Sequence, residues 1–309
     1  MGGQQRIYKQ RIASTQTLAK VFRAMEMIAA SRIGAARRAA SGLGPYEKAL
    51  TQAVAAVAIH TDLDHALTRE RHNTHRVAVL VIASDRGMAG AYAATILRES
   101  ERLITRLNDE GKEPIIYTFG RRACSYFRFR GVAIERSWEG ESDSPTLETT
   151  REIATELLSR FLDGTLMTGV SEVHLVYTRF VSVMSQVPEV RQMLPLSVVD
   201  APESDQERGE ERGYYDDPSS TFPEYEFIPS PEAVLDAILP LYVESRIHNV
   251  LLQSAASELA SRQRAMHTAT DNAEELITKY TRLANSARQA DITQEISEIV
   301  GGADALVAG

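Results

Sequence analysis

With 309 residues, the chain is long enough for one large domain or two modest ones, and its 43% of apolar residues can build a real core. A formal net charge of −8 argues against general nucleic-acid binding, which needs a basic face. The single cysteine, Cys124, excludes an intrachain disulfide, and no apolar run approaches the ~18 residues of a membrane span, so that any membrane association must go through a partner.

Residues 1–60 form the first predicted domain, a coiled-coil helix that covers residues 4–58. Proline is absent before Pro45, and the GLGP segment at 42–45 predicts a kink or a local loosening of this helix. Apolar residues at steps of three, four and three fall on one helical face: Leu18, Val21, Met25 and Ile28. We expect a linker at 61–75 after this helix.

The middle of the chain changes its period. Apolar or alternating segments predict strands at 77–84, 114–119, 133–138 and 172–182. Helical patterns lie between them at 91–109, 121–130 and 145–163. Strands that alternate with helices predict a parallel sheet with helices on its faces, that is, a Rossmann-like α/β domain over residues 76–229.

Local signals predict three further details of this domain. Ser144 and Pro145 suit the N-cap and the first residue of its third helix. The acidic, turn-rich stretch 201–221 predicts an exposed, mobile loop. Residues 222–229 predict a short strand that returns to the body of the domain.

The turn SDRGMAGAY, residues 84–92, follows the first strand and leaves two interpretations open. Gly87 and Gly90 stand three residues apart, which is only a fragment of the G-x-G-x-x-G pattern of dinucleotide sites. One interpretation is a nucleotide-dependent enzyme that uses this turn. We favour a tight strand-to-helix connection, because the enzyme hypothesis leaves the long helices at both ends of the chain unexplained.

The last predicted domain, residues 230–309, is one long helix with Ser230 as its N-cap and Pro231 as its first residue. Neither proline nor glycine occurs between Pro240 and Gly301, and such a stretch of about 60 residues spans ~90 Å as a helix. That length is far beyond an ordinary globular helix.

Apolar residues recur along this helix at alternating steps of four and three, which predicts a left-handed coiled coil. Arg262 is the one charged member of the series. The positions are Leu252, Ala255, Leu259, Arg262, Met266, Ala269, Ala273, Leu276, Tyr280, Leu283, Ala287 and Ala290. A helix buried in a bundle is the alternative, but the chain lacks enough other helix to surround it. The fold class that we expect is α/β, with the N- and C-terminal helices paired as a long antiparallel coiled coil.

The two terminal helices differ in length. Counted from a common base on the central domain, the C-terminal helix outruns its partner from about residue 285. The apolar pattern changes near the same point, after Ala290, to Ile292, Ile296, Ile299 and Val300. An apolar tip without a partner in its own chain usually marks a surface that another protein covers.

Several of these segments resemble the gamma subunit of F-type ATP synthase. They are TLAKVFRAMEMIAASR (17–32), the SDRG turn, MSQVPEVRQMLP (184–195), YVESRI (242–247) and ARQADITQEISEIVGGADAL (287–306). The last is the most specific, and together the segments follow the family's order over nearly the whole chain.

The resemblance implies a rotor in the central stalk that couples proton flow through the membrane c-ring to ATP synthesis. The implied partners are the alpha and beta subunits of the catalytic ring, the epsilon subunit and the c-ring. The chain itself would hold no catalytic residue, no cofactor and no metal. It would be a peripheral protein at the cytoplasmic face of the bacterial cell membrane. A non-rotary coiled-coil adaptor remains an alternative, although it leaves the apolar tip unexplained.

The family's functional residues carry over to individual positions of this sequence. The resemblance implies that Met25 faces a lever segment of the beta subunit, and that four polar residues contact the ring: Arg262, Arg288, Gln289 and Thr293. It also implies that Tyr225 lies near the c-ring. For each residue, the alternative is a solvated side chain without a partner.

Overall fold

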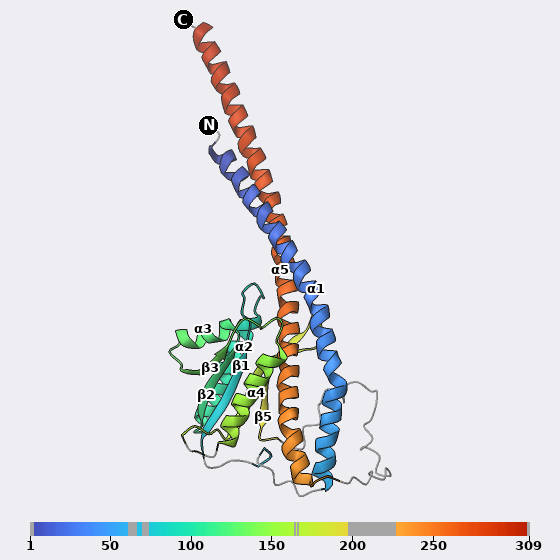
Figure 1. Ribbon diagram of the computed structural model, residues 1–309. Helices are drawn as coiled ribbons and strands as arrows, with labels where there is room; N and C mark the ends of the chain where they lie inside the picture. Colours follow the sequence, from blue (N-terminus) through green and yellow to red (C-terminus); the bar gives the residue numbers. More distant parts are fainter. Residues whose placement is uncertain are drawn as a thin grey trace. The chain divides into compact units, whose positions relative to one another are not determined.

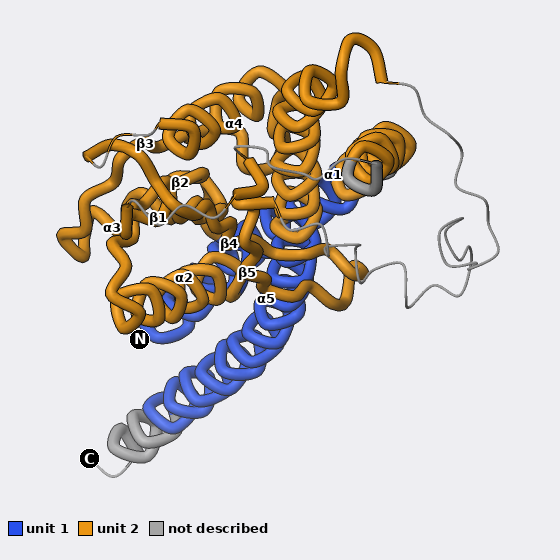
Figure 2. The backbone as a smooth tube through the Cα atoms, turned by 90° about the horizontal axis from the view of Figure 1, so that it is seen from below, with its two compact units in different colours: residues 1–32, 88–90, 259–309 blue, residues 33–87, 91–258 orange. Residues whose placement is uncertain are grey.

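The structure is a computed structural model that describes residues 3–60, 67–69, 74–163, 165, 167–196 and 227–307. Two long helices dominate it: α1 (Gly3–His60) and α5 (Pro231–Val307) (Figure 1). The chain divides into two compact units, and both helices pass from one to the other (Figure 2). We call residues 1–32, 88–90 and 259–309 the coiled-coil unit, and residues 33–87 and 91–258 the α/β unit.

The α/β unit contains one five-stranded sheet of strand order β3-β2-β1-β4-β5. Its strands are β1 (Arg76–Ile82), β2 (Glu113–Phe119), β3 (Ile134–Trp138), β4 (Glu172–Phe180) and β5 (Gln186–Leu194). The first four are parallel to their neighbours, which confirms the predicted strands, whereas β5 runs antiparallel to β4. We did not anticipate β5, because its sequence QVPEVRQML carries charges and a proline, and proline is tolerated in an edge strand.

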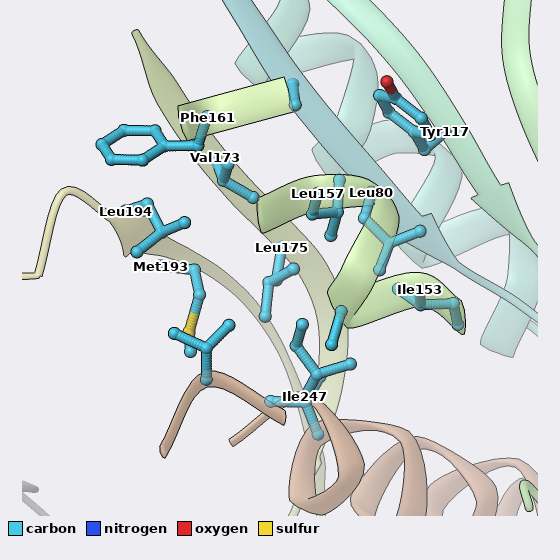
Figure 3. Close-up of a cluster of buried hydrophobic side chains, with 14 of the residues drawn as sticks. Leu80, Tyr117, Ile153, Leu157, Phe161, Val173, Leu175, Met193, Leu194 and Ile247 are labelled. Carbon is cyan, nitrogen blue, oxygen red and sulfur yellow. The ribbon is translucent and has the colours of Figure 1, made fainter. Parts of the chain in front are cut away.

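The central strand β1 is buried on both faces, as expected for a parallel sheet covered by helices. Val77, Val79 and Val81 face a core that includes α2 (Tyr92–Asp109) and α3 (Arg121–Phe129). The alternate residues of β1 face a second core with α4 (Leu147–Leu162) and the first part of α5, shown in Figure 3. This second core holds Leu80, Leu157, Leu175 and Ile247, and also Trp138, which stacks on Tyr117.

Helix α4 begins later than we predicted. Its N-cap is Thr146, whose side chain accepts a hydrogen bond from the backbone N–H of Thr149 at 3.2 Å, so the prediction of Ser144 and Pro145 is wrong. The Glu141 carboxylate also accepts from the Thr146 backbone N–H and hydroxyl, at 3.2 and 2.9 Å, and these bonds hold the cap in place. The local Ser-Pro signal was outweighed by a carboxylate five residues before the cap.

Helix α5 begins at Pro231 as predicted, and the Ser230 hydroxyl accepts a hydrogen bond from the backbone N–H of Ala233 at 3.3 Å. Helix α1 continues through Pro45 without a break in its helical assignment. Residues 227–229, the described part of the predicted strand 222–229, form no strand. The predicted loop 201–221 lies outside the described residues, as does most of the predicted linker 61–75.

In the coiled-coil unit, α1 and α5 lie side by side and run antiparallel (Figure 1). Tyr8 stacks on Tyr280 with ring centroids 6.4 Å apart, and Arg23 pairs with Glu274 at 2.6 Å. Residue numbers rise along α1 as they fall along α5, which confirms the predicted antiparallel pair.

Candidate functional site: one side and the free end of the coiled coil

Nine of the twelve predicted positions on α5 are buried or half-buried, and three are exposed: Leu276, Leu283 and Ala290. Met266, Ala273, Tyr280 and Ala287 are among the nine, as expected. Thr270, Ile277 and Ala284, each one residue after a predicted position, are also buried or half-buried, and Ala269 beside Thr270 is half-buried as expected. Leu276 and Leu283, which we placed inside, are 43% and 37% exposed.

The physical reason is the width of the apolar stripe on α5. Successive residues of a helix point about 100° apart around its axis, so the row Leu276–Leu283 and the row Ile277–Ala284 are neighbours on the helix surface. Both rows fit a four-three spacing. A two-helix seam is narrower than this combined stripe and encloses one row only. Periodicity therefore located the stripe but could not decide which edge of it faces the partner helix.

On α1, too, the residues at the seam lie one position after the predicted ones. Leu18, Val21 and Ile28 do share one helical face, but they are 51%, 48% and 57% exposed. The residues that follow them, Ala19, Phe22 and Ala29, are the less exposed ones and lie toward the seam. An apolar row on α1 thus remains uncovered next to the seam.

The exposed rows of the two helices lie on the same side of the coiled coil. Both helices turn with the same hand, and they run in opposite directions, so a residue just before a seam position points to the same side in each. Together the two rows form what we call the apolar side: Leu18, Val21, Ile28, Leu276 and Leu283.

The opposite side of the coiled coil is charged. By the same geometry, residues just after a seam position share this other side, and Arg23 and Glu274, which follow Phe22 and Ala273, form their ion pair there. His267 follows Met266, and its Nδ1 lies 3.1 Å from a carboxylate oxygen of Glu26. The coiled coil therefore presents two chemically different sides, one with the exposed apolar rows and one with these charged pairs.

The end of α5 extends beyond the start of α1 (Figure 1). Tyr8 lies beside Tyr280, so Gly3, five residues earlier, is level with about residue 285 of the antiparallel helix, which agrees with the expected point. Helix α5 continues to Val307, and about 22 further residues correspond to about 33 Å at 1.5 Å per residue. We call this segment, 286–307, the free end.

The free end carries the predicted apolar stripe. Ile292, Ile296 and Ile299 follow at steps of four and three, so they share one face, and they are 44%, 56% and 71% exposed. The side chain of Val300, the fourth predicted residue of this stripe, lies outside the described set. Large apolar side chains in such a row form a surface that a partner protein can cover.

The predicted polar contact residues fall in two environments. Arg262 is only 6% exposed, on the buried face of α5, whereas Arg288, Gln289 and Thr293 are exposed on or next to the free end. The Thr293 hydroxyl donates its hydrogen to the Gln289 backbone carbonyl at 2.9 Å. Its oxygen can therefore only accept further hydrogen bonds.

Two other predicted residues can be located less fully. Met25 is half-buried in the turn of α1 between Val21 and Ile28. Tyr225 lies outside the described residues. The roles of all these residues in binding other subunits stay predictions.

The turn after β1 is held by a carboxylate. The Asp85 oxygens accept hydrogen bonds from the backbone N–H groups of Arg121 and Ser142, both at 2.9 Å, and the Ser142 hydroxyl accepts from the Asp85 N–H at 2.8 Å. Burial raises the pKa of Asp85, but hydrogen bonds from the backbones of Gly140, Ser142 and Arg121 outweigh it, so the net pKa is lowered. The residue is therefore an anion at neutral pH.

Backbone segments pack closely together at the same edge of the sheet. The Gly120 N–H donates to the Trp138 carbonyl at 2.8 Å, and the Ala83 N–H donates to the Phe119 carbonyl at 2.8 Å. Gly120 has φ +98°, and a Cβ there would lie 2.2 Å from the Ala83 carbonyl oxygen. In doubly wound α/β proteins, nucleotides bind at this carboxyl edge. Here an anionic side chain and a closely packed backbone occupy it, which supports the interpretation as a structural turn.

No helix within the described ranges is long and apolar enough to cross a bilayer. In the part of the chain that the structure describes, no group of three or more His, Cys, Asp or Glu side chains could hold a metal ion. The uncovered coiled-coil surface therefore remains the candidate site.

Comparison with known proteins identifies the family. A family model described as ATP synthase matches residues 4–306. A curated protein from Beutenbergia cavernae, named ATP synthase gamma chain, is 59% identical over 308 residues and covers 100% of both chains. The chain belongs to the ATP synthase gamma-chain family. This confirms both the resemblance seen in the sequence and the predicted function as the rotor subunit of F-type ATP synthase.

A second curated relative and two solved structures extend the comparison. The gamma chain of Micrococcus luteus is 51% identical over 306 residues and covers 99% of each chain. A solved structure of the mitochondrial ATP synthase of Euglena gracilis matches with a TM-score of 0.64 at 15% identity, covering 100% of this chain and 96% of that one. A central-stalk chain of the Tetrahymena thermophila enzyme matches with a TM-score of 0.55 at 21% identity, covering 81% and 99%. At these identities the two structures show the shared fold.

Proposed function

We propose that this gamma chain is a non-catalytic shaft, which turns inside a ring of alternating alpha and beta subunits and couples proton flow through a membrane c-ring to ATP synthesis. The observation that carries the proposal is the uncovered apolar surface of the coiled coil, on one side and at the free end. A free-standing protein would gain about 25 cal/mol for each Å² of this surface that it buried. Its exposure therefore favours a socket built by other chains.

The two unlike sides give the shaft a way to act on its surroundings. A ring subunit that meets the apolar side, with Leu18 and Leu283, gains contacts that it cannot make with the charged side of Arg23 and Glu274. A conformational equilibrium shifts only by the difference in interaction free energy between its states. Rotation of the shaft would bring these unlike sides to each beta subunit in turn and so shift the states of its catalytic site.

Individual residues take specific roles in this proposal. Met25 would face the beta-subunit lever segment, beside the apolar row of α1. Arg288, Gln289 and Thr293 are exposed and would make polar contacts with the ring, and the stripe of Ile292, Ile296 and Ile299 would sit in its apolar lining. Arg262 would act from its nearly buried position on α5, and Tyr225 would lie near the c-ring.

The remaining partners follow from the same proposal. The epsilon subunit and the c-ring would bind this chain, and the complex would lie at the cytoplasmic face of the bacterial cell membrane, with this chain as a peripheral member. The resemblance of the whole chain to gamma chains supports this assignment. The absence of a membrane-spanning helix in the described residues is compatible with it.

Purification of the tagged full-length chain from its native membrane tests the assembly. Alpha, beta and epsilon subunits are expected to elute with it in fixed proportions. Elution of the chain without them would contradict the proposal.

Cross-linking tests the rotation. A cysteine introduced by Gln289→Cys at the free end, joined to a cysteine in a beta subunit, is expected to abolish proton-coupled ATP turnover, and reduction should restore it. Arg128→Cys, on α3 of the α/β unit, is the matched control and should give no beta cross-link. Full coupled turnover after complete cross-linking at position 289 would favour a non-rotary adaptor instead.

A further inference from the structure

A segment of about two turns of α5 within the α/β unit makes polar contacts in two directions. The segment covers Tyr242–Asn249. It contacts α1 through Arg246 and Asn249, and it contacts α4 through Glu244 and His248. We call it the polar junction. The rest of this part of α5 packs through apolar residues such as Leu239, Val243 and Leu251.

The contact with α1 centres on one carboxylate. Glu47 accepts from the Arg246 guanidinium at 3.3 Å through one oxygen and from the Asn249 side-chain amide at 2.5 Å through the other. The side chains of Glu47 and Arg246 are each only 13% exposed. The Arg246 guanidinium also lies 5.7 Å from the ring centroid of Tyr242, and the Gln253 side-chain amide donates to the Asn249 side-chain oxygen Oδ1 at 2.8 Å. Both oxygens of Glu47 are thus held in a defined geometry.

The contact with α4 centres on a buried imidazole. The Thr150 hydroxyl donates its single hydrogen to the Thr146 carbonyl at 2.8 Å, so it accepts from His248 Nδ1, which lies 2.8 Å away. Burial lowers the pKa of His248, and the opposing effect of Glu244 is smaller, so the imidazole is neutral at pH 7 with its hydrogen on Nδ1. Glu244 pairs in turn with Arg151 at 3.4 Å.

These contacts differ physically from the apolar packing around them. Apolar burial has no preferred direction, so by itself it fixes the rotation of a helix less strictly than a directional contact does. A half-buried ion pair or hydrogen bond keeps its favourable energy in one geometry only, and breaking it leaves a poorly solvated charge or dipole. The polar junction therefore opposes rotation of α5 about its own axis relative to both α1 and α4.

We propose that the polar junction is the torsional anchor of the shaft, and that Glu47 is the positioning residue that locks α1 to α5 while torque passes along the pair. The inference rests on the proposed function, because it assigns a mechanical task only if the helices turn as one shaft. It predicts that loss of Glu47 weakens the transmission of torque more than it weakens assembly.

The test compares proton pumping with ATP hydrolysis in membrane vesicles that contain the complete complex. For Glu47→Ala, we expect normal amounts of alpha and beta subunits but a ratio of pumped protons to hydrolysed ATP that falls by about threefold or more, as the coupling energies of contacting charged groups would give. The double variant Glu47→Arg with Arg246→Glu should recover part of the ratio. A merely structural role would lower pumping and hydrolysis together, in step with the amount of complex.

Two controls make the outcome decisive. Arg102→Ala removes an exposed ion pair with Glu99 on α2, and it should leave the ratio at the wild-type value. If Glu47→Ala fails to assemble, Glu47→Gln, which keeps the side-chain shape, is measured in its place. An unchanged ratio in a fully assembled complex would overturn the anchor alone, whereas a wild-type chain that does not co-purify with alpha and beta subunits would overturn the proposed function.

Discussion

The central strand of the α/β unit is fully covered, whereas apolar rows on the helices of the coiled-coil unit are uncovered. In β1, the residues from Val77 to Ile82 are no more than 1% exposed, because helices pack on both faces of the sheet. On α1 and α5 of the coiled-coil unit, leucine and isoleucine side chains such as Leu18 and Ile296 are more than half exposed. The difference teaches that the sheet is buried by helices of its own chain, whereas the coiled coil has apolar rows that its own chain does not cover.

The polar contacts compared next are also more buried in the α/β unit than in the coiled-coil unit. In the α/β unit, Asp85 and Glu47 hold backbone and side-chain donors in half-buried positions. In the coiled-coil unit, the Arg23–Glu274 pair has side chains 63% and 57% exposed, and such pairs contribute only about 0–1 kcal/mol. Directional interactions thus fix the geometry of the α/β unit, while the coiled coil relies on close contact between small side chains.

The largest effect is expected from a leucine in the core of the α/β unit. Leu80→Ala should lower the free energy of unfolding of the full chain by about 2–5 kcal/mol, because it opens a cavity in a closed core. Leu18→Ala, the matched variant at a half-exposed site, should change it by less than about 0.5 kcal/mol. Urea titration followed by circular dichroism measures both, and equal losses would break the comparison.

Asp85→Ala is expected to lower the free energy of unfolding by about 2–3 kcal/mol at pH 7, since the carboxylate accepts two backbone hydrogen bonds as an anion. Its folded pKa lies below the ordinary value of 3.8, so its contribution is complete well above that pH and is lost as the pH falls through the folded pKa. The difference between variant and wild type should therefore shrink below about pH 4, as unfolding titrations from pH 3 to 7 can show. A difference that stays constant over this range would contradict the assignment.

Thr146→Ala should cost about 1 kcal/mol through loss of the α4 N-cap. Ser144→Ala serves as the control, because the hydroxyl two residues earlier does not cap the helix, and it should be close to neutral. Thermal unfolding of the two full-length variants compares them directly. A larger loss for Ser144→Ala would restore the cap position expected from the sequence.

The smallest effect is expected at the exposed ion pair of the coiled coil. Arg23→Ala should change the free energy of unfolding by no more than about 0.5 kcal/mol, and added salt should reduce even that difference. Arg246→Ala in the half-buried pair with Glu47 provides the contrast and should cost clearly more. Similar values for the two would show that burial does not separate the ion pairs of the two units.

Much of the α/β unit could be predicted because its signals are local. Strand β1 is a run of buried apolar residues, and the helix patterns between strands ended within two residues of the observed bounds. Strand β5 was missed because an edge strand with a proline and charges has no apolar alternation. The Asp85 contacts could not be foreseen, since Ser142 lies 57 residues further along the chain and only the folded sheet brings the two together.

For the coiled coil, the sequence predicted the stripe but not its orientation. Both candidate rows on α5 are apolar, and a single sequence cannot say which one meets α1. The exposed row with Leu276 and Leu283 was therefore placed inside by mistake, and the apolar side was overlooked. The sequence did carry a signal for the apolar side, because α5 has two adjacent apolar rows and a two-helix seam needs only one of them. The apolar stripe of the free end was expected, because Ile292, Ile296 and Ile299 change the pattern at the length where α1 ends.

The stacking of Trp138 on Tyr117 has a practical consequence, because Trp138 is the one tryptophan of the chain. Trp138 is 7% exposed in the core of the α/β unit, so fluorescence excited selectively at tryptophan follows the melting of that unit. The far-ultraviolet ellipticity is instead dominated by the two long helices. Both long helices run through both units, so ellipticity reports on the two together, and a loss of ellipticity that precedes the change in fluorescence would reveal a coiled coil that unwinds while the α/β unit stays folded.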